Sequence, residues 1–153
     1  MAEVRIRLLD MADIPACAGI LCDVYNTELW QCRWSQDTAA AYLTDYAEAR
    51  RFVGFVAEME GRVVGAAFAH GKIWWNNTEL ALDELFVAPA HQGQGVGRRL
   101  MEAVEAYAAQ HRLAGVTLST NRHAPAPDFY RRRGYVDCEH VLFMAWEVPD
   151  DPE

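Results

Sequence analysis

The segment that decides the fold is "DELFVAPAHQGQGVGRRLMEAVEAYA", residues 83–108. It begins with a short apolar run, turns at a proline, passes three glycines within five residues and continues as an amphipathic pattern. This order predicts a strand that leads through a tight turn into a helix. Glycines in such a turn let an anion approach the backbone N–H groups at the positive end of the helix. We therefore expect a phosphate-bearing ligand at residues 92–98.

The spacing of the glycines excludes two common phosphate-binding motifs. No Gly-Lys-Ser/Thr follows, so the segment is not a Walker loop. Arg98 stands where the G-x-G-x-x-G motif of dinucleotide folds would have its third glycine. The spacing is instead Gln92-x-x-Gly95-x-Gly97.

The rest of the chain alternates strands and helices around this segment. We expect strands or β-rich runs at 4–10, 51–75 (two), 78–89, 115–120 and 136–148, and helices at 11–26, 36–49, 95–112 and 126–135. Turn signals at 60–62 and 76–78 predict an antiparallel meander. The fold class is therefore α/β in the mixed α+β sense, with the order βααβββαβαβ, in a single domain over residues 1–153.

Charge and composition exclude several kinds of partner. Fourteen basic and twenty-two acidic residues give a formal net charge of -8, which argues against nucleic acid and favours a cationic ligand. The five histidines have no metal-ligand spacing, so no metal is expected. No apolar run approaches the ~20 residues that cross a bilayer, so no membrane is expected either. The four cysteines form no C-x-x-C pair, and Asp10 and Asp13 interrupt any signal sequence, which predicts a cytoplasmic protein.

In this context the sequence resembles the GNAT superfamily of N-acetyltransferases. That family's Q/R-x-x-G-x-G/A signature follows its fourth strand and holds the pyrophosphate of acetyl-CoA. The "FYRRRGY" segment at 129–135 resembles the family's Y-x-x-x-G-F/Y motif. The element order also matches, so the resemblance covers roughly residues 3–148. It implies a GNAT-like mixed, mainly antiparallel central sheet flanked by helices, and acetyl-CoA as co-substrate.

The resemblance also implies which residues hold acetyl-CoA. Leu85, Phe86 and Val87 would pair edge-on with the pantetheine arm, as a peptide strand would. The side chain of Arg98 and the backbone N–H groups of the turn would face the pyrophosphate; the turn residues are Gln92, Gly93, Gln94, Gly95, Val96 and Gly97. Many family members contact pantetheine with an asparagine, and here either Asn121 or His123 would fill that place.

Acyl transfer to an amine needs a neutral amine, a donor to the oxyanion and stabilisation of the departing thiolate. Making a primary amine neutral at pH 7 costs roughly 4 kcal/mol, so a base is useful. Asp83 and Glu84 lie on the strand that leads to the thioester, and alternation of side chains lets only one of them face the amine. We favour Glu84, which shares a face with Phe86, over Asp83. The resemblance places Tyr130 beside the sulfur of CoA, where its hydroxyl would donate to the thiolate.

Two connections, at 25–34 and 72–79, are expected to flank the acceptor. They supply Glu28, Trp30, Trp34, Trp74, Trp75 and Glu79. Aromatic faces beside carboxylates suit an organic cation, which predicts a small aminoglycoside-like or polyamine-like amine as the acceptor. Alternatives are that the tryptophans pack in the core or at a homodimer interface, that the acceptor is a protein or peptide N-terminus or a lysine, or that the chain is a non-catalytic CoA-binding sensor.

Overall fold

The computed structural model describes residues 3–151, which divide into two compact units between Ser119 and Thr120. The first unit contains, in order, β1 (Arg5–Leu8), η1 (Met11–Asp13), α1 (Ile14–Tyr25), α2 (Gln36–Ala47), β2 (Phe52–Met59), β3 (Arg62–Lys72), β4 (Glu79–Val87), η2 (Pro89–His91), α3 (Val96–Gln110) and β5 (Val116–Leu118). The second unit contains α4 (Ala126–Arg132). The predicted order is thus confirmed from the first strand to the last helix.

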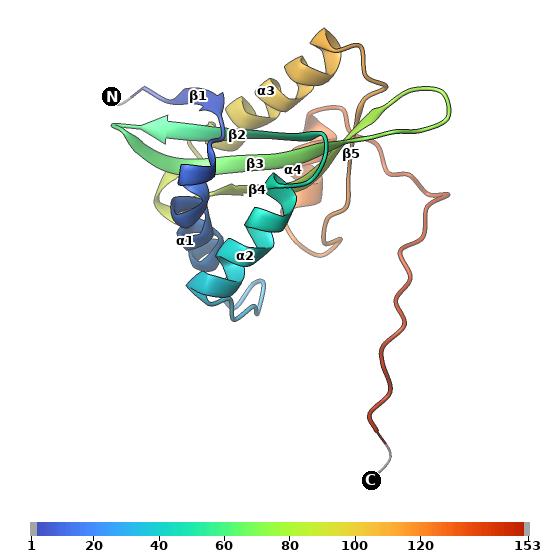
Figure 1. Cartoon of the computed structure of the whole chain (residues 1–153), viewed down its shortest axis with the longest axis horizontal. Helices are drawn as coiled ribbons and strands as arrows, with labels where there is room; N and C mark the ends of the chain where they lie inside the picture. Colours follow the sequence, from blue (N-terminus) through green and yellow to red (C-terminus); the bar gives the residue numbers. More distant parts are fainter. Residues whose placement is uncertain (1–2, 152–153) are drawn as a thin grey trace. The chain divides into compact units, whose positions relative to one another are not determined.

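The first unit is built around a five-stranded sheet in the order β1-β2-β3-β4-β5. Neighbouring strands are antiparallel from β1 to β4, which confirms the meander, and β5 pairs with β4 in parallel. Figure 1 shows α1 and α2 on one face of the sheet and α3 on the other. The chain crosses to α3 because a parallel strand pair needs a long connection, which here is the helix that follows the glycine turn.

Helices cover both faces of the sheet and bury apolar side chains against it. The α1–α2 layer packs on the sheet through Ile14, Cys17, Ala18, Leu21, Ala39, Leu43, Phe68 and Phe86. On the other side α3 buries Val96, Leu100 and Val104, as its amphipathic pattern predicts. The helix α2 begins where the sequence predicts, because Ser35 accepts the N–H of Thr38 at 3.0 Å and so caps the first turn.

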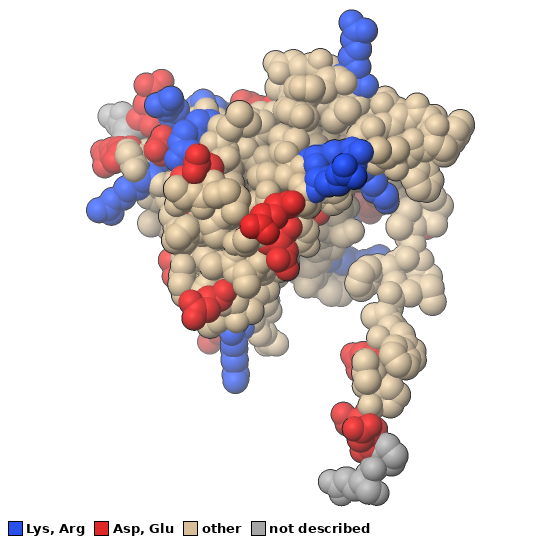
Figure 2. Space-filling view, viewed as in Figure 1, with Lys and Arg blue, Asp and Glu red and all other residues tan. Residues whose placement is uncertain are grey.

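Charged side chains of both signs share the surface. On the face drawn in Figure 2, lysines and arginines form small separate groups among aspartates and glutamates. None of the helices within residues 3–151 has the length and apolarity needed to cross a membrane. All four cysteines are free thiols.

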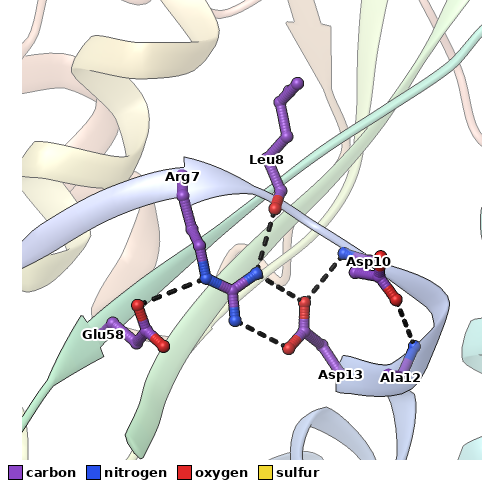
Figure 3. Close-up of polar contacts among 6 residues, drawn as sticks. All are labelled: Arg7, Leu8, Asp10, Ala12, Asp13 and Glu58. Atoms are coloured by element: carbon purple, nitrogen blue, oxygen red, sulfur yellow. Dashed lines mark hydrogen bonds and ion pairs between the residues drawn. The ribbon is translucent and has the colours of Figure 1, made fainter. Parts of the chain in front are cut away.

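A partly buried ion pair joins the start of the sheet to the start of α1 (Figure 3). Arg7 on β1 donates from both terminal nitrogens to the two carboxylate oxygens of Asp13, at 2.8 Å each, and its Nε lies 3.3 Å from Glu58 on β2. The same Asp13 carboxylate accepts the N–H of Asp10 at 2.8 Å. Hydrogen bonding to Arg7 lowers the pKa of Asp13, so the carboxylate stays ionised although it is nearly inaccessible.

The predicted final strand at 136–148 is wrong. The structure has no strand in that segment, and its apolar side chains are exposed, among them Phe143 at 89% and Trp146 at 78%. The physical reason is that alternating apolar residues make a strand only when a neighbouring strand accepts their backbone hydrogen bonds. The unit that starts at Thr120 has no other strand among its described residues to supply that partner.

Candidate active site

The glycine turn has the geometry of an anion site. Gly93 and Gly95 adopt left-handed conformations, with φ of +74° and +83°, and α3 begins immediately afterwards at Val96. Gln92 holds the turn against the end of β4, since its Nε2 donates to the carbonyl of Val87 at 3.0 Å. The N–H of Arg99 donates to the carbonyl of Gly95, and the N–H groups of residues 96–98 precede that first helical bond. They are therefore available to an anion.

The strand that leads into this turn has an open edge. β5 pairs with β4 only from Leu80 to Leu82, opposite residues 116–118, whereas β4 continues to Val87. Residues 83–87 thus have no strand on that side among the described residues. An extended ligand with amide groups, such as a pantetheine arm, fits this edge because it can take the hydrogen bonds that a neighbouring strand would take. The edge, the turn and the start of α3 are consecutive and suit one long phosphate-bearing ligand.

A β-bulge corrects the prediction that Asp83 and Glu84 face opposite ways. Glu84 pairs with Phe68 on β3 and Leu82 pairs with Ala69, which leaves Asp83 as an extra residue without a partner. Phe68 packs in the α1–α2 layer, so Glu84 is on that face. His70, two residues along β3, shares the face of Phe68, and Asp83 lies 2.7 Å from its ring. Alternation fails at the bulge, and both carboxylates are on the α1–α2 side of the sheet.

Glu84 is held by two tyrosines from the helices above it. Its Oε1 accepts the hydroxyl of Tyr42 on α2 at 2.5 Å, and its Oε2 accepts that of Tyr25 on α1 at 3.2 Å. Burial raises the pKa of Glu84, the two hydroxyl donors lower it, and neighbouring Asp83 raises it, with burial the largest effect. Burial and the bond to Glu84 raise the pKa of Tyr42 in turn, so the phenol stays protonated and remains a donor.

Asp83 forms a second polar pair on the same face. Its Oδ2 lies 2.7 Å from Nδ1 of His70, and the side chains are 12% and 33% exposed, respectively. Burial raises the pKa of Asp83, and the interaction with His70 opposes that shift. Two carboxylates and an imidazole thus lie at the point where β4 leaves β5.

Two of the predicted acceptor residues are joined to Glu84 through the tyrosines. Trp30 packs edge-on against Tyr25 with ring centres 5.1 Å apart, and Trp34 packs against Tyr42 at 4.9 Å. A pocket of about 310 Å³ opens beside them, lined by Cys32, Arg33, Trp34, Ser35 and Thr38. The aromatic rings therefore border the face that carries the carboxylates.

Among the described residues, Glu84 has no hydrogen bond or ion pair to any of the other four predicted acceptor residues. Trp74 and Trp75 are on the connection between β3 and β4 and are 53% and 86% exposed, so neither packs in the core. Lys72 lies over the ring of Trp74 at 5.6 Å. Glu28 is an exposed residue of the connection between α1 and α2, and Glu79 begins β4 opposite Lys72. Among the described residues, no ring contact joins Trp74 or Trp75 to the aromatic residues near Glu84.

Three predicted residues belong to the unit after Ser119. Tyr130 is 8% exposed on α4, and its ring packs against Phe129 and Tyr135 at 5.2 and 5.6 Å. Asn121 uses its side chain locally, because its Oδ1 accepts the N–H of His123 at 2.9 Å. The assignment of these residues to the thiolate and to pantetheine stays a prediction.

Sequence reasoning missed Tyr25, Tyr42 and His70. Tyr42 and Tyr46 are four apart on a helix that follows Trp34, a spacing that marks one aromatic face. Tyr25 and His70 carried no comparable signal, because only the packing of α1 on the sheet and the bulge in β4 give them their partners.

Residues 50–137 match the sequence profile of the acetyltransferase (GNAT) domain. The chain belongs to the GNAT acetyltransferase family. GNAT enzymes use acetyl-CoA as their co-substrate.

One relative and two solved structures show what this GNAT chain is similar to. Streptothricin acetyltransferase of Streptomyces lavendulae is 32% identical over 118 residues, a match that spans 67% of this chain and 60% of that protein. An integron cassette protein of Vibrio cholerae superimposes with a TM-score of 0.80 at 20% identity, covering 95% of this chain and 93% of that one. Aminoglycoside N-acetyltransferase AAC(6')-Iy in complex with CoA superimposes with a TM-score of 0.76 at 18% identity, over 97% of each chain. These two solved structures share the fold of this chain.

Proposed function

We propose that the chain is an acetyl-CoA-dependent N-acetyltransferase that transfers an acetyl group directly to a primary amine of a small cationic acceptor. The observation that carries the proposal is the open edge of β4 at residues 83–87, which has the Asp83 bulge at one end and leads to the glycine turn at the other. A pantetheine arm along this edge would direct its phosphates to α3 and its thioester to the bulge.

The residues of the chain have separate tasks in this proposal. The N–H groups at the start of α3 and the guanidinium of Arg98 bind the phosphates, and the carboxylates of Asp83 and Glu84 attract the acceptor's ammonium group. Acetyl-CoA supplies the activated acyl thioester. Tyr130 hydrogen-bonds the departing sulfur, and Asn121 or His123 contacts the pantetheine arm, as the family pattern implies.

A cationic acceptor agrees with the surroundings of Glu84. Trp30 and Trp34 stand behind the tyrosines that bind this carboxylate, and aromatic faces near a negative charge favour a cation. The net charge of -8 adds long-range attraction. The similarity to streptothricin acetyltransferase supports a small molecule rather than a protein as the acceptor.

The test is an assay of thiol release from acetyl-CoA with aminoglycosides, streptothricin, polyamines, amino acids and peptides. We expect the highest kcat/KM with a polycationic small molecule, and an acceptor KM that rises with salt because exposed charges are screened beyond about 10 Å at 0.1 M. If a peptide were the best acceptor, the chain would be a protein acetyltransferase and the small-molecule proposal would be wrong. Acetyl-CoA binding without turnover of any amine would leave only a CoA-binding sensor.

A further inference from the structure

We propose that His70 is the general base that takes the proton from the acceptor's amine, and that Asp83 holds its imidazole ring in position. The inference rests on the proposed acetyltransferase function, because it names the base of that same site. It replaces Glu84, which the sequence pattern favours, with a residue that the sequence pattern does not single out.

The position of the imidazole is the first argument. His70 pairs with Ala81 on β4, and its Nδ1 lies 2.7 Å from Asp83. Asp83 is the bulged residue, and it directly follows Leu82, the last residue of β4 that pairs with β5. The imidazole therefore lies where the edge of β4 opens, which is the place proposed for the thioester.

The orientation of the ring is the second argument. An ionised Asp83 can only accept a hydrogen bond, so the proton between the two groups is on Nδ1 of His70. A neutral imidazole with its proton on Nδ1 has its lone pair on Nε2. No residue within 3–151 bonds Nε2, and the side chain is 33% exposed, so an amine can reach that nitrogen.

The occupancy of Glu84 is the third argument. Each of its two oxygens already accepts a phenol, from Tyr42 and from Tyr25. Both phenols donate to the ionised carboxylate and stabilise that form, so these two hydrogen bonds lower the pKa of Glu84 and make it a weaker base. The structure suits Glu84 to attracting an ammonium group and His70 to deprotonating it.

Charged and titratable groups from the sheet and from both helices surround the His70–Asp83 pair. These groups are Asp83, Glu84 and Glu79 on β4, Lys72 on β3, and the phenols of Tyr25 on α1 and Tyr42 on α2. Three carboxylates outnumber the one ammonium group. This excess of negative charge attracts a cationic acceptor to the pair.

The proton balance of the step is complete without another reactant. One proton of the acceptor's ammonium group passes to Nε2 of His70, and the freed nitrogen lone pair forms the C–N bond of the amide. The C–S bond of the thioester breaks, and its electron pair leaves with the sulfur. A second proton from the nitrogen ends on that sulfur as a thiol, and the imidazolium returns its proton to solvent.

The experiment compares His70→Gln, Asp83→Asn and His140→Gln with the wild type. Glutamine and asparagine keep polar atoms where the His70–Asp83 contact forms, and His140 is an exposed residue of the other unit, so its variant is the matched control. The measurements are kcat/KM against pH with the best amine of the panel, the dissociation constant of acetyl-CoA and the melting temperature.

We expect His70→Gln to lower kcat/KM at pH 7 by about 100-fold or more, the usual contribution of a general base. Its rate should keep rising with pH towards the pKa of the free amine, while acetyl-CoA affinity stays unchanged. Asp83→Asn should give a smaller loss, and His140→Gln none.

A His70→Gln enzyme with a wild-type pH profile would overturn the assignment and leave the acetyltransferase function intact, even if its melting temperature falls, because a merely structural pair would lower stability alone. Wild-type protein that turns over no amine would instead reject the proposed function and this base together.

Discussion

Replacing Gly95 with alanine should weaken acetyl-CoA binding more than it weakens the fold. Gly95 has a φ of +83°, so alanine there must adopt the left-handed conformation, which costs about 1–2 kcal/mol. The three atoms nearest to the added Cβ all belong to the guanidinium of Arg98, with Nη2 at 3.4 Å, and that side chain is 64% exposed and can shift. The backbone strain alone corresponds to a fall in melting temperature of about 2–8 °C for a chain of this size.

The same methyl group would stand at the N-terminus of α3, where we propose that the pyrophosphate meets the backbone N–H groups. Moving the phosphates away from those donors should raise the dissociation constant of acetyl-CoA at least tenfold, which is about 1.4 kcal/mol. Gly95→Asp should raise it further, since a carboxylate would repel the phosphates.

Gly61 offers a matched control. It lies in the turn between β2 and β3, has a φ of +76°, and no atom lies within 4 Å of the Cβ that alanine would add. Gly61→Ala therefore carries the same backbone strain without approaching the proposed ligand. Calorimetric titration with acetyl-CoA and thermal melts of both variants separate the two effects. Equal affinity losses in both variants, or wild-type affinity in Gly95→Ala, would refute the assignment of the turn to the pyrophosphate.

Three further predictions concern single side chains. Tyr42→Phe removes a donor that lowers the pKa of Glu84, so that pKa should rise further and the acceptor KM should begin to increase at a higher pH as the solution is acidified; an unchanged KM–pH profile would contradict this. Tyr130→Phe should lower kcat without changing acetyl-CoA affinity, and an unchanged kcat would assign the hydroxyl to packing. Asp13→Asn should cost about 1–3 kcal/mol of unfolding free energy at neutral pH, because it breaks the pair with Arg7. Folding lowers the pKa of Asp13, so this stabilisation is fully present above the unfolded-state pKa of about 3.9 and is lost as the pH falls through the folded-state pKa. Below that pH, urea unfolding should give the same unfolding free energy for the variant and the wild type.

The sequence predicted the parts of the site that depend on neighbours along the chain. The glycines at 93 and 95 occupy left-handed positions, and α3 begins at Val96 as the pattern indicates. The start of α2 after Ser35 and the turn at Gly61 are confirmed for the same reason. In each case the conformation is set by one or two residues, since glycine tolerates positive φ and serine accepts the first free N–H of a helix.

The last strand shows the limit of such local evidence. The alternation at 136–148 is a property of the segment, whereas a strand is a property of a pair, and the described residues of its unit contain no partner. The pattern therefore specified a segment able to form a strand without specifying that it does.

The sequence by itself determined that a strand leads through a glycine turn into a helix, because that local geometry depends on consecutive residues. The tertiary structure alone decided which side chains gather beside it. Pairing with β3 leaves Asp83 unpaired in a bulge and turns it to the face of Glu84, where it meets His70. Packing of α1 and α2 brings Tyr25 and Tyr42 to Glu84 from positions 59 and 42 residues away. Side-chain alternation is a local rule, and it predicts that Asp83 and Glu84 lie on opposite faces of the sheet. A bulge and a helix–sheet contact arise only when distant segments pair, and the bulge places both carboxylates on the same face.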